Sequence, residues 1–124
     1  MLKVLHVDDE PHIREVAAFA LELDPDLEVR SAASGREALA LLGESFAPDV
    51  ILLDVMMPEL DGPGTLEQLR RLPDLADTPV IFMTARAQSH ELDRFLKLGA
   101  IAVIVKPFDP MALARQVRDH LASR

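Results

Sequence analysis

The sequence predicts an α/β fold of the flavodoxin-like type, a doubly wound (βα)5 domain whose five-stranded parallel sheet has the order 2-1-3-4-5. Short apolar runs alternate with segments whose apolar residues recur at helical spacing, and the connections between them are short. Three of the runs stay apolar until a polar residue follows, which is typical of strands buried on both faces. Strands are expected at residues 3–7, 27–32, 50–54, 79–84 and 100–105.

The bulk properties of the chain exclude several classes of function. The 124 residues are enough for one domain, residues 1–124, and contain no repeat or linker. A net charge of −8 argues against nucleic-acid binding by this domain. The absence of cysteine excludes disulfides, thiolate zinc sites and cysteine nucleophiles. The apolar runs are too short to cross a bilayer, and the strand pattern begins at Lys3 with no room for a signal peptide, so we expect a cytoplasmic location.

The first two strands are each followed by a helix with a clear start signal. Residues 3–7 lead into an acidic turn, and a proline then suits the first position of a helix over residues 11–23. Residues 27–32 alternate between polar and apolar, as an edge strand does. Ser34 and Glu37 fit a capping box at the start of the second helix.

Prolines and glycines mark the bounds of the remaining helices. Residues 59–64 are turn formers and predict a loop after the third strand. The later helices are expected at residues 65–72 before Pro73, around Leu92, Phe95 and Leu96 before Gly99, and from Asp109-Pro110 to the C-terminus.

Polar residues follow the strands at the edge where a parallel sheet binds ligands. Asp8 and Asp9 follow the first strand, Asp54 ends the third, and the fourth and fifth end in Thr84 and Lys106. The predicted strand order makes strands one and three neighbours, which brings three carboxylates together. Such close acids raise one another's pKa unless a cation neutralises them, and oxygen ligands without His or Cys favour Mg²⁺.

The same edge holds the groups that phosphoryl transfer requires. Lys106 supplies a positive charge, Thr84 supplies a hydroxyl, and a carboxylate can act as the acceptor. A divalent cation beside them would neutralise charge during an in-line displacement. The buried strand that runs into Asp54 makes this residue the expected reactive group.

Four segments of the chain resemble the signature segments of receiver domains of two-component response regulators. They are Val7-Asp8-Asp9-Glu10, the stretch from Leu53 to Gly62, Met83-Thr84-Ala85 and Val105-Lys106-Pro107-Phe108. The resemblance implies that Asp54 accepts a phosphoryl group from a phosphohistidine on a sensor histidine kinase or a histidine phosphotransfer protein.

The resemblance also assigns roles to the other residues of the site. It implies that Asp9, Asp54 and the backbone carbonyl of Met56 bind Mg²⁺, with Asp8 acting mainly through water. Lys106 would pair with phosphoryl oxygens, and Thr84 would turn to hydrogen-bond one of them. The domain would catalyse only its own phosphorylation and dephosphorylation. It would contact a downstream protein through the face formed by helix 4, strand 5 and helix 5, as a monomer or a phosphorylation-dependent dimer.

Several alternatives remain open from the residues alone. Asp8 or Asp9 could serve as the N-cap of the first helix, Thr84 as an ordinary strand end and Lys106 as an exposed lysine. A Mg²⁺-dependent phosphohydrolase with an aspartyl nucleophile is a second function, although such enzymes usually carry another acid where this chain has Met56. A degenerate receiver that binds partners without phosphorylation is a third.

The chain departs from the family pattern at the position that usually carries the signal outward. Val103 stands where the family often has an aromatic residue, so the signal is expected to pass through the loop containing Ala85 and Arg86. The resemblance implies that Met56 and Arg86 occupy the positions that control the approach of water to the aspartyl phosphate, and the bulky apolar Met56 predicts a long-lived phosphorylated state. His6 is expected to be a packed, hydrogen-bonded core residue, and Met56 and Met57 are expected to pack in their loop.

Overall fold

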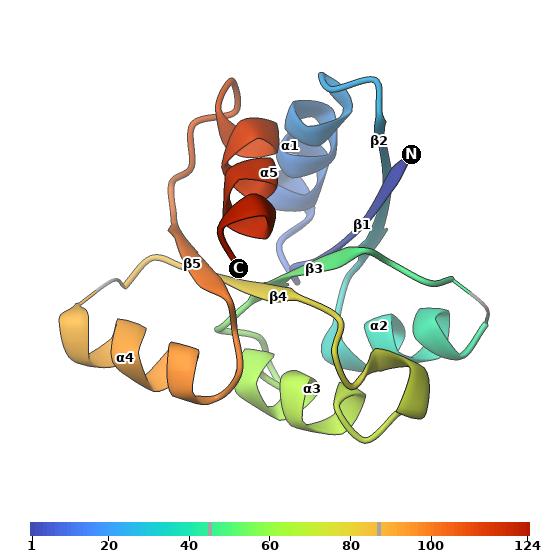
Figure 1. Ribbon diagram of the computed structural model, residues 1–124, viewed down its shortest axis with the longest axis vertical. Coiled ribbons are helices and arrows are strands. Elements are labelled where there is room, and N and C mark those ends of the chain that lie inside the picture. The colour runs from blue at the N-terminus through green and yellow to red at the C-terminus, as the bar shows by residue number, and fades with distance from the viewer. Residues whose placement is uncertain (45, 87) are drawn as a thin grey trace.

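A computed structural model describes residues 1–44, 46–86 and 88–124, and it contains one sheet of five parallel strands (Figure 1). The strand order is β2-β1-β3-β4-β5, so the predicted doubly wound fold is confirmed. The strands are β1 (Leu2–Val7), β2 (Leu27–Ala32), β3 (Val50–Asp54), β4 (Val80–Thr84) and β5 (Ala102–Val105). The helices are α1 (Pro11–Glu22), α2 (Gly35–Gly43), α3 (Gly62–Leu69), α4 (Ser89–Lys97) and α5 (Leu113–Ser123), with a short 3-10 helix at Pro73–Leu75.

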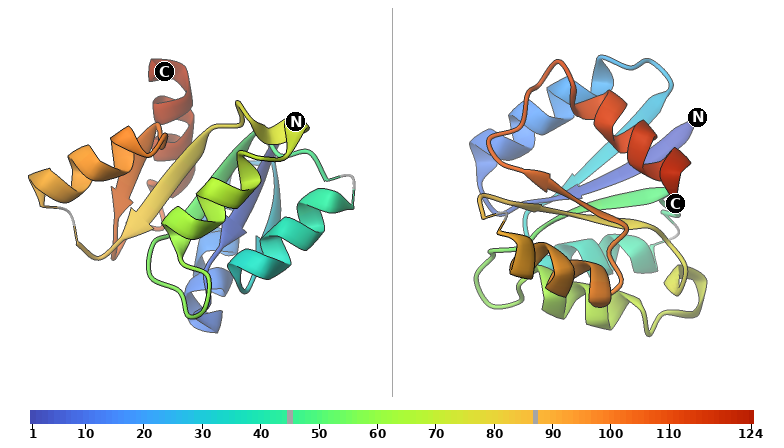
Figure 2. Two further views of the ribbon diagram at one scale, coloured as in Figure 1. Left: turned by 90° about the horizontal axis from the view of Figure 1, so that it is seen from below. Right: turned by 60° about the vertical axis from the view of Figure 1, so that its left-hand side comes forward.

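Helices cover both faces of the sheet. Helices α1 and α5 lie on one face, and α2, α3 and α4 lie on the other (Figures 1 and 2). Neighbouring residues of a strand therefore pack into different core layers: Leu52 joins the layer under α1 and α5, and Leu53 joins the layer under α2 to α4. Because β3 lies between β1 and β4, all five of its residues are buried. The last residue of this buried strand is Asp54.

The first two helices begin where the sequence indicates. Glu10 is the N-cap of α1, and its carboxylate accepts hydrogen bonds from the backbone N–H groups of His12 and Ile13 at 3.0 and 3.2 Å. The alternative that Asp8 or Asp9 caps this helix is therefore wrong. Ser34 caps α2 by accepting from the N–H of Glu37 at 3.1 Å, as predicted.

The bounds of two helices, α3 and α5, differ from the prediction. Helix α3 begins at Gly62, three residues before the predicted start, because the Asp61 side chain accepts from the N–H of Gly64 and caps the first turn. The helix also ends at Leu69, and Pro73 begins the 3-10 helix rather than ending α3. Helix α5 begins at Leu113 rather than at Pro110, because Asp109 holds a separate turn by accepting from the N–H of Met111.

The fifth strand is shorter and more exposed than predicted. It begins at Ala102 instead of residue 100, and its last residue, Val105, is exposed because β5 forms an edge of the sheet. Gly99 ends α4 as predicted and adopts a φ of 114°, a conformation that glycine accepts readily. The Lys106–Pro107 peptide bond is cis.

Two further predictions about side chains are wrong in part: His6 is packed but lacks the expected hydrogen bonds, and only Met57 of the two methionines packs in the loop. His6 is fully buried in β1, but neither ring nitrogen has a hydrogen-bond partner among the described residues. Burial lowers the pKa of His6 to about 4, so its imidazole is neutral at pH 7. Met56 does not pack in its loop, since 77% of it is exposed, whereas its neighbour Met57 is buried. Within the described residues, no helix is long and apolar enough to span a membrane.

Candidate functional site

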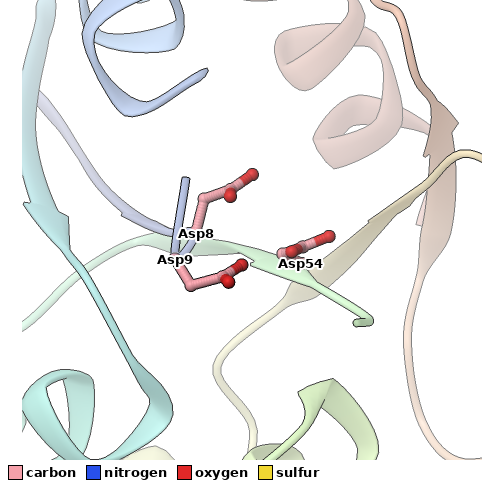
Figure 3. Close-up of side chains that lie close together, drawn as sticks. All are labelled: Asp8, Asp9 and Asp54. Atoms are coloured by element: carbon pink, nitrogen blue, oxygen red, sulfur yellow. The ribbon is translucent and has the colours of Figure 1, made fainter. Parts of the chain in front are cut away.

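Three aspartates meet at the carboxyl edge of the sheet, where the strand order reverses between β1 and β3. Asp8 and Asp9 follow β1, and Asp54 ends β3 (Figure 3). Each offers a carboxylate oxygen, and these oxygens all lie within 4.8 Å of one another. Asp8 and Asp54 are buried, whereas Asp9 is exposed. The sequence prediction of an acidic cluster is therefore confirmed.

Lys106 extends from the end of β5 into this cluster. Its ammonium Nζ lies 2.7 Å from Oδ2 of Asp8 and 2.9 Å from Oδ1 of Asp54. The lysine side chain is 18% exposed, so these contacts form largely out of water. The alternative of an exposed lysine before a turn is wrong, because Lys106 bridges two buried carboxylates.

The charges of the site shift the ionisation of Asp54 and Lys106. Burial raises the pKa of the Asp54 carboxyl, and the nearby charges of Asp8 and Asp9 act in the same direction, while Lys106 opposes them. Burial alone would lower the pKa of Lys106, but its hydrogen bonds to Asp8 and Asp54 outweigh that effect and raise it. Lys106 therefore stays charged and partly compensates the acids.

Thr84 ends β4, and Met56 follows two residues after Asp54. Thr84 is buried, and its hydroxyl oxygen accepts a hydrogen bond from the N–H of Arg86 at 3.1 Å. Its carbonyl accepts from the N–H of Lys106 at 2.8 Å, so Thr84 and Lys106 are linked directly. The exposed Met56 lines a shallow pocket with Met57, Pro58 and Asp61. The role of the Met56 carbonyl stays a prediction.

Three residues near the site were missed by sequence reasoning. Glu10 caps α1, and its place directly before a proline at the first helical position could have revealed this role. Arg14 donates from Nη1 to the carbonyl oxygen of Asp8 at 2.7 Å, and no local sequence signal indicates this contact. Gly62 packs so closely that an added Cβ would lie 2.6 Å from the carbonyl oxygen of Asp54.

The donor set fits a hard divalent cation. Three carboxylates supply oxygen ligands, and the described residues near them offer no thiolate. Burial is the main cause of the raised pKa of Asp54, and a divalent cation bound to these oxygens would offset the repulsion from Asp8 and Asp9 that adds to it. The structure thus provides an acidic site of the kind that binds a metal ion.

The fold and the site together define a class, namely small doubly wound α/β domains that gather acidic side chains at the switch point of a parallel sheet. A family model described as the response regulator receiver domain matches residues 4–118. The chain belongs to this family of two-component receiver domains, and it is a receiver rather than a conventional enzyme.

Individual relatives agree with this assignment. The chain is 39% identical over 119 residues to a probable transcriptional regulator, ycf27, of Porphyridium aerugineum, covering 96% of this chain and 48% of the relative. It is 37% identical over 121 residues to the response regulator Rre1 of a Synechocystis strain, covering 98% of this chain and 52% of the relative. The chain therefore spans about half the length of these relatives.

Solved structures show the same fold. The chemotaxis protein CheY4 of Vibrio cholerae superposes with a TM-score of 0.88 at 34% identity, covering 96% of this chain and 98% of that one. The receiver domain of Francisella response regulator 1452 gives a TM-score of 0.85 at 31% identity over the full length of both chains. Both are similar to this chain along almost its whole length.

Proposed function

We propose that residues 1–124 form one receiver domain that accepts a phosphoryl group on Asp54 from a phosphohistidine donor. The observation that carries this proposal is the position of Lys106, whose Nζ lies 2.9 Å from Asp54 in a cluster of three acids. Asp54 ends a fully buried strand, so its carboxylate is held in a fixed place at the edge of the sheet. Such positioning is the main requirement of phosphoryl transfer.

In the proposed step, a carboxylate oxygen of Asp54 attacks the phosphorus of the donor. A P–O bond forms, the P–N bond to the donor imidazole breaks, and that nitrogen takes a proton from solvent. Lys106 already contacts the acceptor, and its ammonium group then pairs with the phosphoryl oxygens. The hydroxyl of Thr84 donates to one of them.

We assign the metal of this site as Mg²⁺. Asp9, Asp54 and the carbonyl of Met56 would hold it directly, and Asp8 would act through water. When bound, Mg²⁺ neutralises the negative charge that gathers as the phosphoryl group approaches the acids. The exposure of Asp9 supports access by a hydrated cation from solvent.

The partners proposed for this chain follow from its family. A sensor histidine kinase or a histidine phosphotransfer protein would supply the phosphoryl group in the cytoplasm. A downstream protein would dock on the α4–β5–α5 face, and this is supported by exposed apolar residues on that part of the chain: Leu96, Leu98, Val105 and Met111. The domain would act as a monomer or a phosphorylation-dependent dimer, and it would not itself bind nucleic acid.

Intact mass spectrometry after incubation with acetyl phosphate tests the proposal. In the presence of Mg²⁺, the protein should gain the mass of one phosphoryl group, and chelation of the metal should abolish the gain. Asp54→Asn should show no gain. Asp119→Asn is the matched control, because Asp119 is exposed on α5 away from the acidic cluster, and it should behave like the unaltered protein.

Other outcomes would contradict the proposal in different ways. No mass gain in any protein would indicate a degenerate receiver that binds partners without phosphorylation. Equal gain in Asp54→Asn and in the unaltered protein would place the acceptor at another residue.

A further inference from the structure

Arg14 reaches back from the first turns of α1 to the turn that carries two acids of the site. Its Nη1 donates to the carbonyl oxygen of Asp8 at 2.7 Å, and the side chain is partly buried. Its own N–H donates to the carbonyl of Glu10, as expected within the helix. Arg14 therefore closes a loop between the end of β1 and the start of α1.

Every polar atom of Asp8 has a partner in this arrangement. Its N–H donates to Ala32 on β2, and its Oδ1 accepts from the N–H of Glu10 at 2.9 Å. Its Oδ2 accepts from Lys106, and its carbonyl oxygen accepts from Arg14. The contacts with Ala32 and Glu10 come from the backbone. Among the side chains, Lys106 belongs to the reacting cluster, whereas Arg14 does not.

This difference decides what Arg14 can do during function. Under the proposed function, Lys106 turns towards the phosphoryl group and loosens its hold on Asp8. The contact from Arg14 is independent of that movement, because it is made to the backbone behind the carboxylate. Asp9 follows Asp8 directly, so the same contact also fixes the backbone from which Asp9 extends.

We propose that Arg14 is a positioning residue for the divalent cation, acting by holding the β1–α1 turn so that Asp8 and Asp9 are preorganised. The inference rests on the proposed function of the acidic site. If Arg14 acted only as a nearby positive charge, its guanidinium would repel the cation, and its removal would strengthen cation binding. Our proposal is that positioning outweighs this repulsion, so loss of the contact weakens binding.

The test is a Mg²⁺ titration of the unphosphorylated protein, followed by amide chemical shifts or by calorimetry. Arg14→Gln should bind Mg²⁺ about tenfold more weakly, which is the smallest loss of metal affinity typical when a group that orients a metal ligand is removed. Arg14→Lys, which keeps the charge on a shorter side chain, should show an intermediate loss. In phosphorylation by acetyl phosphate, both variants should need more Mg²⁺ for half-maximal rate while keeping the rate at saturating Mg²⁺.

Arg70→Gln provides the matched control. Arg70 donates to the carbonyl oxygens of Leu75 and Thr78 at 2.9 and 2.6 Å, so it makes the same kind of contact in the connection between α3 and β4. Its substitution should leave Mg²⁺ affinity unchanged, even where thermal unfolding shows lower stability. A weakening equal to that of Arg14→Gln would show a general stability effect and would overturn the inference.

The remaining outcomes separate the inference from the proposed function. Binding of Mg²⁺ by Arg14→Gln as tight as in the unaltered protein, or tighter, overturns the inference alone. Unchanged Mg²⁺ binding by Arg14→Lys also overturns the inference. This variant provides the test if thermal unfolding shows that Arg14→Gln does not fold. Failure of the unaltered protein to bind Mg²⁺ overturns the metal site of the proposed function, and the inference with it.

Discussion

At the scale of single residues, the central feature is a lysine that bridges two buried carboxylates. Lys106 compensates acids that would otherwise repel one another, since its Nζ contacts both Asp8 and Asp54. The raised pKa of Asp54 shows that this compensation is incomplete, because burial and the other acids outweigh it. Because the negative charge of these carboxylates is only partly compensated, binding of a cation at this site is favourable.

Met56 is predicted to prolong the phosphorylated state. Its bulky apolar side chain is exposed in the pocket beside Asp61, two residues after the acceptor, and it gives an attacking water no hydrogen-bond partner. Met56→Ala should therefore shorten the half-life of the phosphorylated protein, measured by loss of the added mass with time. Met111→Ala, an equally exposed methionine outside that pocket, is the control. A markedly longer half-life in Met56→Ala would rule out the shielding role.

His6 is predicted to lower stability. Its two ring nitrogens are buried without partners among the described residues, and such groups cost roughly 1–3 kcal/mol. His6→Leu, of similar size, should raise the free energy of unfolding by about 1 kcal/mol at pH 7, measured by urea denaturation. His12→Leu, at an exposed position of α1, should bring no such gain. A less stable His6→Leu protein would show that the imidazole has a partner that this explanation lacks.

At the scale of elements, the sequence predicted which elements form but misplaced some of their bounds. The start of α3 was missed because Gly62, Pro63 and Gly64 are turn formers, and local preference alone argues for a loop. What overrides it is tertiary: Asp61 caps the helix, and Gly62 fits against the backbone of Asp54 where a larger residue would clash. The site residues were predictable because each lies at the end of a strand, whereas the contact of Arg14 depends on how a side chain crosses back over a turn.

The connection after β4 links the site to the surface. The hydroxyl of Thr84 accepts from the backbone N–H of Arg86, so a rotation of this hydroxyl alters the hold on the loop. Val103 lies on β5 opposite Phe82 and packs partly buried against the core layer under α2 to α4. A valine is too small to swing in and out as an aromatic residue does, so the loop is the better route for the signal.

Val103 is accordingly predicted to be dispensable for phosphorylation. Val103→Ala should take up a phosphoryl group from acetyl phosphate at an unchanged rate, because the side chain of Val103 packs against the apolar core layer under α2 to α4. Thr84→Ala is the positive control and should slow the reaction. A large loss of phosphoryl uptake in Val103→Ala would mean that the β5 position takes part in the site after all.

At the scale of the whole molecule, the strand order brings distant parts of the chain together. Asp8 and Lys106 are 98 residues apart in sequence, but Nζ of Lys106 lies 2.7 Å from Oδ2 of Asp8. The contact forms because β1 and β5 are strands of one parallel sheet, so the residues that follow them lie at the same carboxyl edge. A second long-range contact joins the same two ends of the chain: Arg118 on α5 pairs with Asp24 after α1 at 2.6 Å.

This surface ion pair is predicted to make stability depend on pH in the acid range. The hydrogen bond from Arg118 lowers the pKa of Asp24 below its usual 3.8, with help from the N–H of Asp26. The contribution of this ion pair to stability is therefore fully present above pH 3.8, and it is lost as the pH falls through the lower pKa that Asp24 has in the folded protein. Double-mutant cycles of Asp24→Asn and Arg118→Gln, measured by thermal unfolding, should give a small favourable coupling at pH 6 that vanishes in strong acid. Coupling that persists unchanged in strong acid would contradict this assignment.

The most direct test of the central claim is to locate the phosphoryl group. After phosphorylation with acetyl phosphate and Mg²⁺, borohydride reduces an aspartyl phosphate to homoserine, which peptide mass spectrometry can identify. We predict homoserine at position 54, in a yield that falls to background when Mg²⁺ is chelated. Homoserine at Asp8 or Asp9 instead, or no homoserine in a protein that has gained the phosphoryl mass, would contradict the assignment of Asp54 as the acceptor.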